Sequence, residues 1–144
     1  MAPVVVDDVE SLPLNESAVL LTLAMRAAHA GHWALDLRTN EAYCSPEYAT
    51  LIGVGPETPP SWDNWVAAVH PHDRQRAAEG VRACIDAHRE IDVEFRVVRG
   101  DGAVRWVAAK GQTYYGADGE AVRYFAICYG EIFLSIQAIT SLAK

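Results

Sequence analysis

The chain has 144 residues, of which 51% are apolar and 22% charged, which is typical of one globular domain that buries its own core. No apolar run is long enough to span a membrane. The first ten residues contain acidic but no basic side chains, so we expect no signal peptide. The net charge of −7 disfavours nucleic acids and membranes as partners.

The three cysteines, Cys44, Cys84 and Cys128, are far apart in the sequence and form no Cys-X-X-Cys pair. The spacing therefore excludes a zinc ribbon and a thioredoxin-type redox site. We expect a reduced protein of the cytoplasm, in which the cysteines serve as small core residues.

Residues 1–14 are interrupted by prolines and predict a flexible arm, whereas residues 15–30 predict a helix that flanks the main domain. Gly31 fits the left-handed position that follows such a helix. The apolar stripe of the helix is narrow, so the helix should lie on another surface. The stripe consists of Val19, Leu20, Leu23, Ala24 and Ala27.

Residues 32–38 alternate between apolar and polar side chains, which predicts a half-buried strand paired in a hairpin with residues 41–44. Ser45 is suited to cap a short helix that starts at Pro46 and stops at Gly53.

A second short helix is expected after Ser61, and a longer helix over residues 74–88, with Asp73 as its cap. Strands at 91–98, 104–115 and 121–132 follow, separated by glycine-rich turns. The last two strands are apolar on both faces, which favours a sheet covered on both sides.

These elements predict an α+β fold: a five-stranded antiparallel sheet with short helices over one face and the N-terminal helix on the other. The concave space between sheet and helices is the expected place for a ligand. A sealed core is as compatible with this sequence as an occupied pocket. The side chains expected to line the space are Tyr43, Tyr48, Leu51, Trp65, Val81, Cys84, Ile85, Phe95, Val97, Tyr124 and Cys128.

Several segments, taken in order, resemble PAS domains of the branch found in bacterial sensor histidine kinases and diguanylate cyclases. They are Gly-His-Trp-Ala-Leu-Asp-Leu from Gly31, Tyr-Cys-Ser-Pro-Glu from Tyr43, Trp-Val-Ala-Ala-Val-His-Pro-His-Asp-Arg from Trp65, and Glu-Phe-Arg-Val-Val-Arg-Gly-Asp-Gly from Glu94. Each segment alone is a weak signal, but their order and spacing make the resemblance specific.

The resemblance implies a PAS fold over residues 31–132, followed by a C-terminal tail at 133–144. It also implies a module that senses small molecules, dimerises or binds partners without catalysis of its own. The chain departs from the family at Gly130, where such modules commonly have the aspartate that leads into a linker helix. Since the chain starts with Met1 and only the tail follows the domain, we expect a free-standing module.

The His-Pro-His-Asp segment that starts at His70 could suggest a metal site. Two histidines beside a proline and one carboxylate favour a turn at the start of a helix instead, and we expect no metal. Some PAS domains hold haem through a helix histidine, for which His88 is the candidate and His72 the other possibility. A role for His88 at the helix C-terminus is favoured over haem. The flavin-adduct motif Asn-Cys-Arg-Phe-Leu-Gln of light-sensing PAS domains is absent. We expect no cofactor, with haem as the alternative.

Glu94, Arg96 and Arg105 lie on two neighbouring predicted strands joined by a short hairpin. Cross-strand ion pairs are the favoured interpretation. The alternative is that Arg96 or Arg105 binds the carboxylate of a ligand through two parallel hydrogen bonds.

A second candidate surface is apolar and lies outside the expected ligand space. The flanking helix could cover the outer face of the sheet, or both could mediate a homodimer. The residues of this surface are Val19, Leu20, Leu23, Phe125, Ile127, Tyr129, Phe133 and Leu134.

The favoured function is a non-catalytic PAS module of bacterial signalling, which dimerises or docks on a partner such as a histidine kinase and is tuned by a small apolar ligand. One alternative is a sensor that binds haem or another small molecule. Another is a small isomerase or dehydratase with a His–Asp or Tyr–His pair in the cup. No acidic residue lies inside an apolar stripe, where a catalytic base with a shifted pKa is expected, which disfavours the enzyme.

Overall fold

The computed structural model describes residues 14–130 of the chain. The elements follow one another as a helix, a strand pair, three helices and three long strands. Their bounds are α1 Leu14–Ala27, β1 Gly31–Asp36, β2 Ala42–Cys44, α2 Pro46–Ile52, α3 Trp62–Ala68, α4 Arg74–Asp86, β3 Ile91–Val98, β4 Val104–Tyr115 and β5 Ala121–Gly130.

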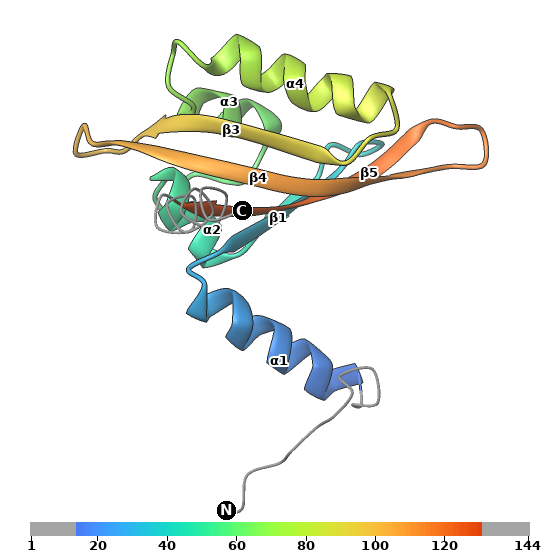
Figure 1. Cartoon of the computed structure of the whole chain (residues 1–144), viewed down its shortest axis with the longest axis horizontal. Helices are drawn as coiled ribbons and strands as arrows, with labels where there is room; N and C mark the ends of the chain where they lie inside the picture. The colour runs from blue at the N-terminus through green and yellow to red at the C-terminus, as the bar shows by residue number, and fades with distance from the viewer. Residues whose placement is uncertain (1–13, 131–144) are drawn as a thin grey trace, which may run out of the picture.

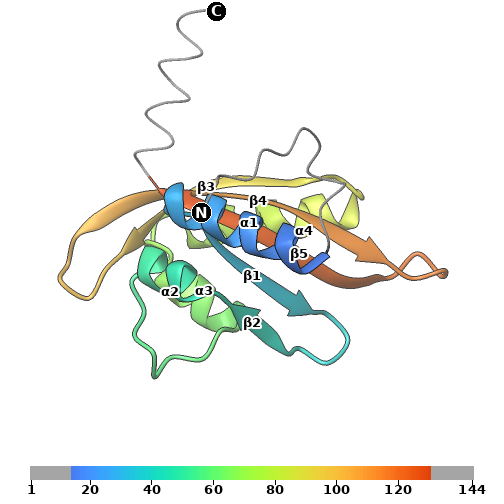
Figure 2. The same cartoon turned by 90° about the horizontal axis from the view of Figure 1, so that it is seen from below.

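The strands form one five-stranded antiparallel sheet in the order β2-β1-β5-β4-β3. Helices α2, α3 and α4 cover one face, which we call the inner face, and α1 lies beyond the other, the outer face (Figure 1). The view from below shows α1 crossing beneath the sheet near β5 (Figure 2). The predicted α+β fold class and its layers are therefore confirmed.

Local sequence signals explain most element boundaries. The Ser45 hydroxyl accepts a hydrogen bond from the backbone N–H of Tyr48, and Pro46 occupies the first turn of α2. Gly53 ends this helix in the left-handed conformation at φ 78°. Ser61 caps α3 in the same way, through the N–H of Asn64.

Two helices end on a histidine at the position where glycine is usual. His29 after α1 and His88 after α4 have φ values of 54° and 56°. Each end has the two hydrogen bonds of a Schellman motif. After α1, the N–H groups of His29 and Ala30 donate to the carbonyls of Arg26 and Met25, and after α4 those of His88 and Arg89 donate to the carbonyls of Ile85 and Cys84. The prediction that Gly31 fills this role for α1 is wrong. Gly31 starts β1, where a Cβ would lie 2.3 Å from the backbone nitrogen of Tyr48.

The core lies between the inner face of the sheet and α2–α4. A smaller cluster on the outer face joins the C-terminal end of α1 to the sheet. It consists of Ala30, Ala108 and Tyr129, with Met25 and Ala28 packed against them. The strand prediction for 121–132 extends two residues beyond β5 as described, and the tail predicted at 133–144 lies outside the described residues.

No helix among residues 14–130 combines the length and the apolar character that crossing a bilayer requires.

Candidate functional site

The interior between the sheet and the helices is occupied by a cluster of aromatic rings. Trp33 of β1 is at its centre, with ring centroids 5.7 Å from Tyr48, 6.5 Å from Trp65 and 5.2 Å from Tyr124. Trp65 is also 5.4 Å from Phe95 in an edge-to-face contact. Rings at these separations are in contact, so aromatic side chains fill the centre of the space in which a ligand was expected.

The structure brings together most of the side chains predicted to line that space. Ten of them belong to the main core cluster or pack directly against it, namely Tyr48, Leu51, Trp65, Val81, Cys84, Ile85, Phe95, Val97, Tyr124 and Cys128. Tyr43 is not, because it is 66% exposed and pairs with Ala34, on the opposite face from Trp33. Its placement in the lining is therefore wrong, since a strand turns successive side chains to opposite faces.

Trp33, the ring at the centre of the aromatic interior, is missing from the predicted lining. It is 3% exposed and touches three of the other rings. The alternation of Trp33 and Leu35 with polar residues in β1 was a sufficient signal to place it inside.

The polar atoms of the cluster are held in their neutral forms. Burial raises the pKa of the Tyr48 and Tyr124 hydroxyls far above the usual value and raises the pKa of the Cys128 thiol to about 12. These three groups are therefore not ionised near neutral pH and supply neither a thiolate nucleophile nor a phenolate base.

The residues present do not fit a haem held by an internal histidine. All five histidines are among the described residues, and none belongs to the buried core. His88, the predicted candidate, lies past the end of α4 and stacks on Tyr115 with ring centroids 3.7 Å apart. His72 is exposed at the α3–α4 turn.

The His70–Asp73 turn joins the helical layer to the sheet. The Asp73 carboxylate accepts hydrogen bonds from Arg96 Nε at 2.9 Å and Nη2 at 2.7 Å, and a third from the Arg96 backbone N–H at 2.9 Å. The N–H of His70 donates to the Arg96 carbonyl at 2.8 Å. β3 is an edge strand of the sheet. The segment that leads into the turn pairs with β3 through a bridge between Val69 and Val97, and so covers part of this edge.

Asp73 is the N-cap residue of α4, as predicted, but it makes no side-chain capping bond to the helix, because its carboxylate is held by Arg96. The predicted ion pair across the strands is wrong, because Glu94 lies opposite Ala108 and Arg105 lies opposite Val97 in the register of β3 and β4. The Arg96 guanidinium binds a carboxylate through two bonds, as the alternative required, but the carboxylate is the chain's own Asp73.

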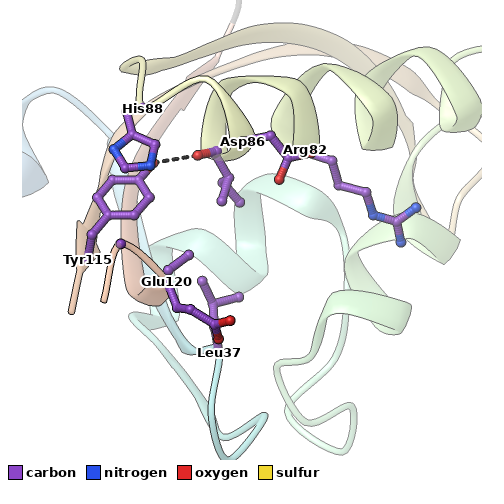
Figure 3. Close-up of a pocket in the computed structure, with 9 residues that line it drawn as sticks. Leu37, Arg82, Asp86, His88, Tyr115 and Glu120 are labelled. Atoms are coloured by element: carbon purple, nitrogen blue, oxygen red, sulfur yellow. Dashed lines mark hydrogen bonds between the residues drawn. The ribbon is translucent and has the colours of Figure 1, made fainter. Parts of the chain in front are cut away.

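A cleft of about 530 Å³ opens between the end of α4 and the β4–β5 hairpin. Figure 3 shows the His88 ring lying over the Tyr115 ring at one side of the cleft, with Glu120 and Leu37 below them and the Arg82 guanidinium directed away. The Tyr115 hydroxyl donates to the Ile85 carbonyl at 2.6 Å. The stack and this bond attach the hairpin to the end of α4. The residues that the structure describes include no group of three or more His, Cys, Asp or Glu side chains suited to bind a metal ion.

The outer face carries exposed apolar side chains. Phe125 and Ile127 of β5 are 43% and 45% exposed, and Phe125 meets Tyr114 edge-to-face at 5.6 Å. The apolar residues of α1 do not cover them: Val19, Leu20 and Leu23 are 59%, 43% and 56% exposed. Tyr129 is buried beneath the end of α1 instead. Phe133 and Leu134, also predicted for this surface, lie outside the described residues.

The structure thus combines a five-stranded antiparallel sheet, three helices packed on one face and an aromatic interior. The family model described as PAS fold matches residues 41–128, which is more than half of the chain. The chain therefore belongs to the PAS family, and the predicted resemblance is confirmed.

Three proteins illustrate the relationship. The chain is 27% identical over 106 residues to the blue-light-activated histidine kinase of Brucella anthropi. The aligned segment covers 74% of this chain and 22% of that protein. It is 29% identical over 107 residues to the protein named Probable diguanylate cyclase DgcE of Escherichia coli K12, covering 74% of this chain and 10% of that protein. Its structure matches a sensory box histidine kinase/response regulator of Burkholderia thailandensis with a TM-score of 0.67 at 26% identity, covering 85% of this chain and 92% of that one.

The chain thus spans about a fifth or less of the length of these two sequence relatives. These relationships show that the chain is a PAS sensory domain of the kind present in signalling proteins such as histidine kinases.

Proposed function

We propose that the chain is a non-catalytic PAS module that works by contact, associating with a second copy of itself and acting on a signalling partner such as a histidine kinase. The observation that carries this proposal is the pair of exposed apolar surfaces, one on α1 and one on the outer face of the sheet. In the dimer, the apolar surface of α1 in one copy packs against the apolar outer face of the sheet in the other copy.

The two surfaces are suited to each other for a geometric reason. The apolar cluster that joins α1 to its own sheet lies at the C-terminal end of the helix, where Met25 and Ala28 pack against Ala30, Ala108 and Tyr129. Leu20 and Leu23, farther toward the N-terminal end of the helix, are 43% and 56% exposed, and this end of α1 extends away from the sheet (Figure 1). Association with a second copy removes this apolar area from water, at a gain of about 25 cal/mol per Å².

Sedimentation velocity over a concentration series tests this association. The wild type should shift from monomer to dimer as its concentration rises, and the L20E/L23E variant should remain a monomer because charge is buried at the contact. The matched control is Ala18→Glu, which adds a carboxylate to another side of the same helix. Equal association of all three proteins, or a monomer at every concentration for the wild type, would contradict the proposal.

The interior supports a module without chemistry of its own. Burial raises the pKa values of Tyr48, Tyr124 and Cys128 and so keeps these groups neutral, and the buried Asp73 carboxylate is held by Arg96. An isomerase or dehydratase needs a general base in the cup, and this arrangement does not favour one. Incubation with a panel of 2-hydroxy acids and enolisable ketones, monitored by NMR, should leave the substrates unchanged.

The haem alternative is disfavoured on the same grounds, because aromatic rings occupy the interior and the histidines lie outside it. Native mass spectrometry combined with an absorbance spectrum of freshly purified protein tests this directly. The proposal predicts the mass of the polypeptide alone and no Soret band, whereas a Soret band would restore haem as the ligand.

The three cysteines are free, which supports a reducing compartment such as the cytoplasm.

A further inference from the structure

A second hollow lies at the opposite end of β4 from the cleft of Figure 3, where the β3–β4 hairpin meets the segment between α2 and α3 (Figure 1). Its volume is about 270 Å³, below the 300–1,000 Å³ that is usual for drug-sized ligands. We call it the Arg99 groove. Its lining consists of Ile52, Gly53, Val54, Thr58, Asn64, Ala67, Ala68, Val98, Arg99 and Gly100.

Arg99 is the single charged residue of this lining. Its Nε is buried and has no hydrogen-bond partner among the described residues. The side chain runs against the backbone at Gly53, where a Cβ would lie 2.9 Å from Arg99 Cγ. Buried donors are nearly always paired, because an unpaired one loses its hydration without compensation. The Nε–H of Arg99 therefore lacks the acceptor that buried donors usually have, while the side chain as a whole is only half-buried.

The other arginines on this side of the sheet differ from Arg99 in this respect. Arg96, three residues earlier, has its guanidinium held by the Asp73 carboxylate. Arg74 donates from Nε and Nη2 to the carbonyls of Val69 and Ala67. Among residues 14–130, no carboxylate lies in the lining of the Arg99 groove to do the same.

The composition of the lining narrows the ligand class. A guanidinium offers parallel N–H donors that match the two oxygens of a carboxylate, and the hydroxyl of Thr58 and the amide of Asn64 lie in the same lining. The rest of the wall is aliphatic, from Ile52, Val54 and Val98 together with two alanines. Such a wall accommodates methylene groups better than it does a hydrated inorganic anion.

We propose that the Arg99 groove binds small aliphatic carboxylic acids, with the carboxylate on Arg99 and the hydrocarbon body against Ile52, Val54 and Val98. This site lies outside the aromatic interior and does not involve α1 or the outer face. It goes beyond the proposed association of two copies, and either one can fail without the other.

Titration of the ¹⁵N-labelled full chain with sodium hexanoate, followed by NMR, tests the proposal. Hexanoate should move the Arg99 Nε–H signal and the amide signals of Gly53 and Thr58 along one saturable curve. Equal concentrations of 1-hexanol, which lacks the carboxylate, and of inorganic phosphate, which lacks the hydrocarbon, should move them at least about tenfold less effectively.

Variants make the result specific to this arginine. Arg99→Gln should weaken hexanoate binding at least about tenfold. Arg105→Gln, which removes an exposed arginine of the same hairpin, should bind like the wild type. Amide spectra of both variants report whether the fold is kept, and Arg99→Lys gives a second test at unchanged charge, with weaker binding expected because the paired donors are lost.

Three results would overturn the proposal: binding of hexanoate to R99Q at wild-type affinity, phosphate binding as tightly as hexanoate, or shifts that do not saturate. Because the readout is a local chemical shift, none of these depends on the oligomeric state of the protein.

Discussion

Asp73 and Arg96 are 23 residues apart in the sequence and form a two-bond ion pair with Nη2–Oδ1 at 2.7 Å and Nε–Oδ2 at 2.9 Å. The pair joins the α3–α4 turn to strand β3, and the Arg96 guanidinium also lies 5.6 Å from the centre of the Trp106 ring. Asp73 is 5% exposed, so its three accepted bonds replace the water it gave up on folding.

Removal of the Asp73 charge should destabilise the domain. Asp73→Asn keeps the shape but weakens both bonds to the guanidinium and leaves the cation unpaired, and we expect a loss of about 2 kcal/mol in the free energy of unfolding. Urea denaturation measures it. The control is Arg76→Gln, since Arg76 lies 3.6 Å from Asp73 at an exposed position and should cost less than about 0.5 kcal/mol. Equal losses for the two variants would show that the Arg96 pair has no special weight.

The same pair predicts how stability depends on pH. Hydrogen bonds from Arg96 hold the pKa of Asp73 well below its usual value of 3.8. A carboxyl whose pKa is lower in the folded state stabilises that state above the pKa of the unfolded chain, and the contribution is lost as pH falls through the folded pKa.

The difference in stability between the wild type and D73N should therefore be constant from pH 7 to about pH 5 and should shrink as the pH falls below about 4. Denaturation curves at a series of pH values measure this difference. A difference that stays unchanged at low pH would mean that the Asp73 charge is not what stabilises the turn.

Truncation of Trp65 should open the aromatic interior. Its ring contacts those of Trp33, Trp62 and Phe95 at centroid distances of 6.5, 5.1 and 5.4 Å, and Trp65→Ala should cost about 4 kcal/mol. The resulting apolar cavity should bind indole, which would raise the melting temperature of W65A but not that of the wild type. The control is Tyr43→Ala, at the exposed tyrosine of β2, with a cost below about 1 kcal/mol. An equal rise in the melting temperatures of W65A and the wild type with indole would contradict the prediction, since the wild-type interior would then already have room for a ligand.

The left-handed backbone of His88 makes its replacement sensitive to the substituent. His88→Ala and His88→Gly both remove the stack on Tyr115, but alanine must also adopt a φ of 56°, which glycine accepts readily. H88A should therefore be about 1 kcal/mol less stable than H88G in thermal or chemical denaturation. The same stability for both variants would contradict a role for this backbone conformation in ending α4.

The sequence was sufficient to predict the layers of this fold, because alternation in the strands and turn chemistry at Ser45, Gly53 and the glycine-rich hairpins act locally. The helix ends at His29 and His88 could not be read in the same way. Histidine has no strong local preference for the left-handed position, and the stacking that favours it at His88 involves Tyr115, 27 residues farther along the chain.

The candidate sites were harder to predict for the same physical reason. The partner of Arg96 depends on how the α3–α4 turn packs on β3, and this packing cannot be derived from the register of the strands. Residue parity placed Phe125 and Ile127 on one face of β5, but it did not show that α1 leaves the sheet and remains uncovered over Leu20 and Leu23. Arg99 has no sequence signal at all, since its isolation depends on which carboxylates happen to lie elsewhere.

The association of α1 with the outer sheet face of a second copy is tested most directly by intermolecular nuclear Overhauser effects. In a sample that mixes ¹³C-labelled and unlabelled protein, filtered spectra should show contacts from the methyl groups of Leu20 and Leu23 in one copy to Phe125 and Ile127 in the other. Contacts confined to other surfaces, or none in a sample concentrated enough to populate a dimer, would contradict the account.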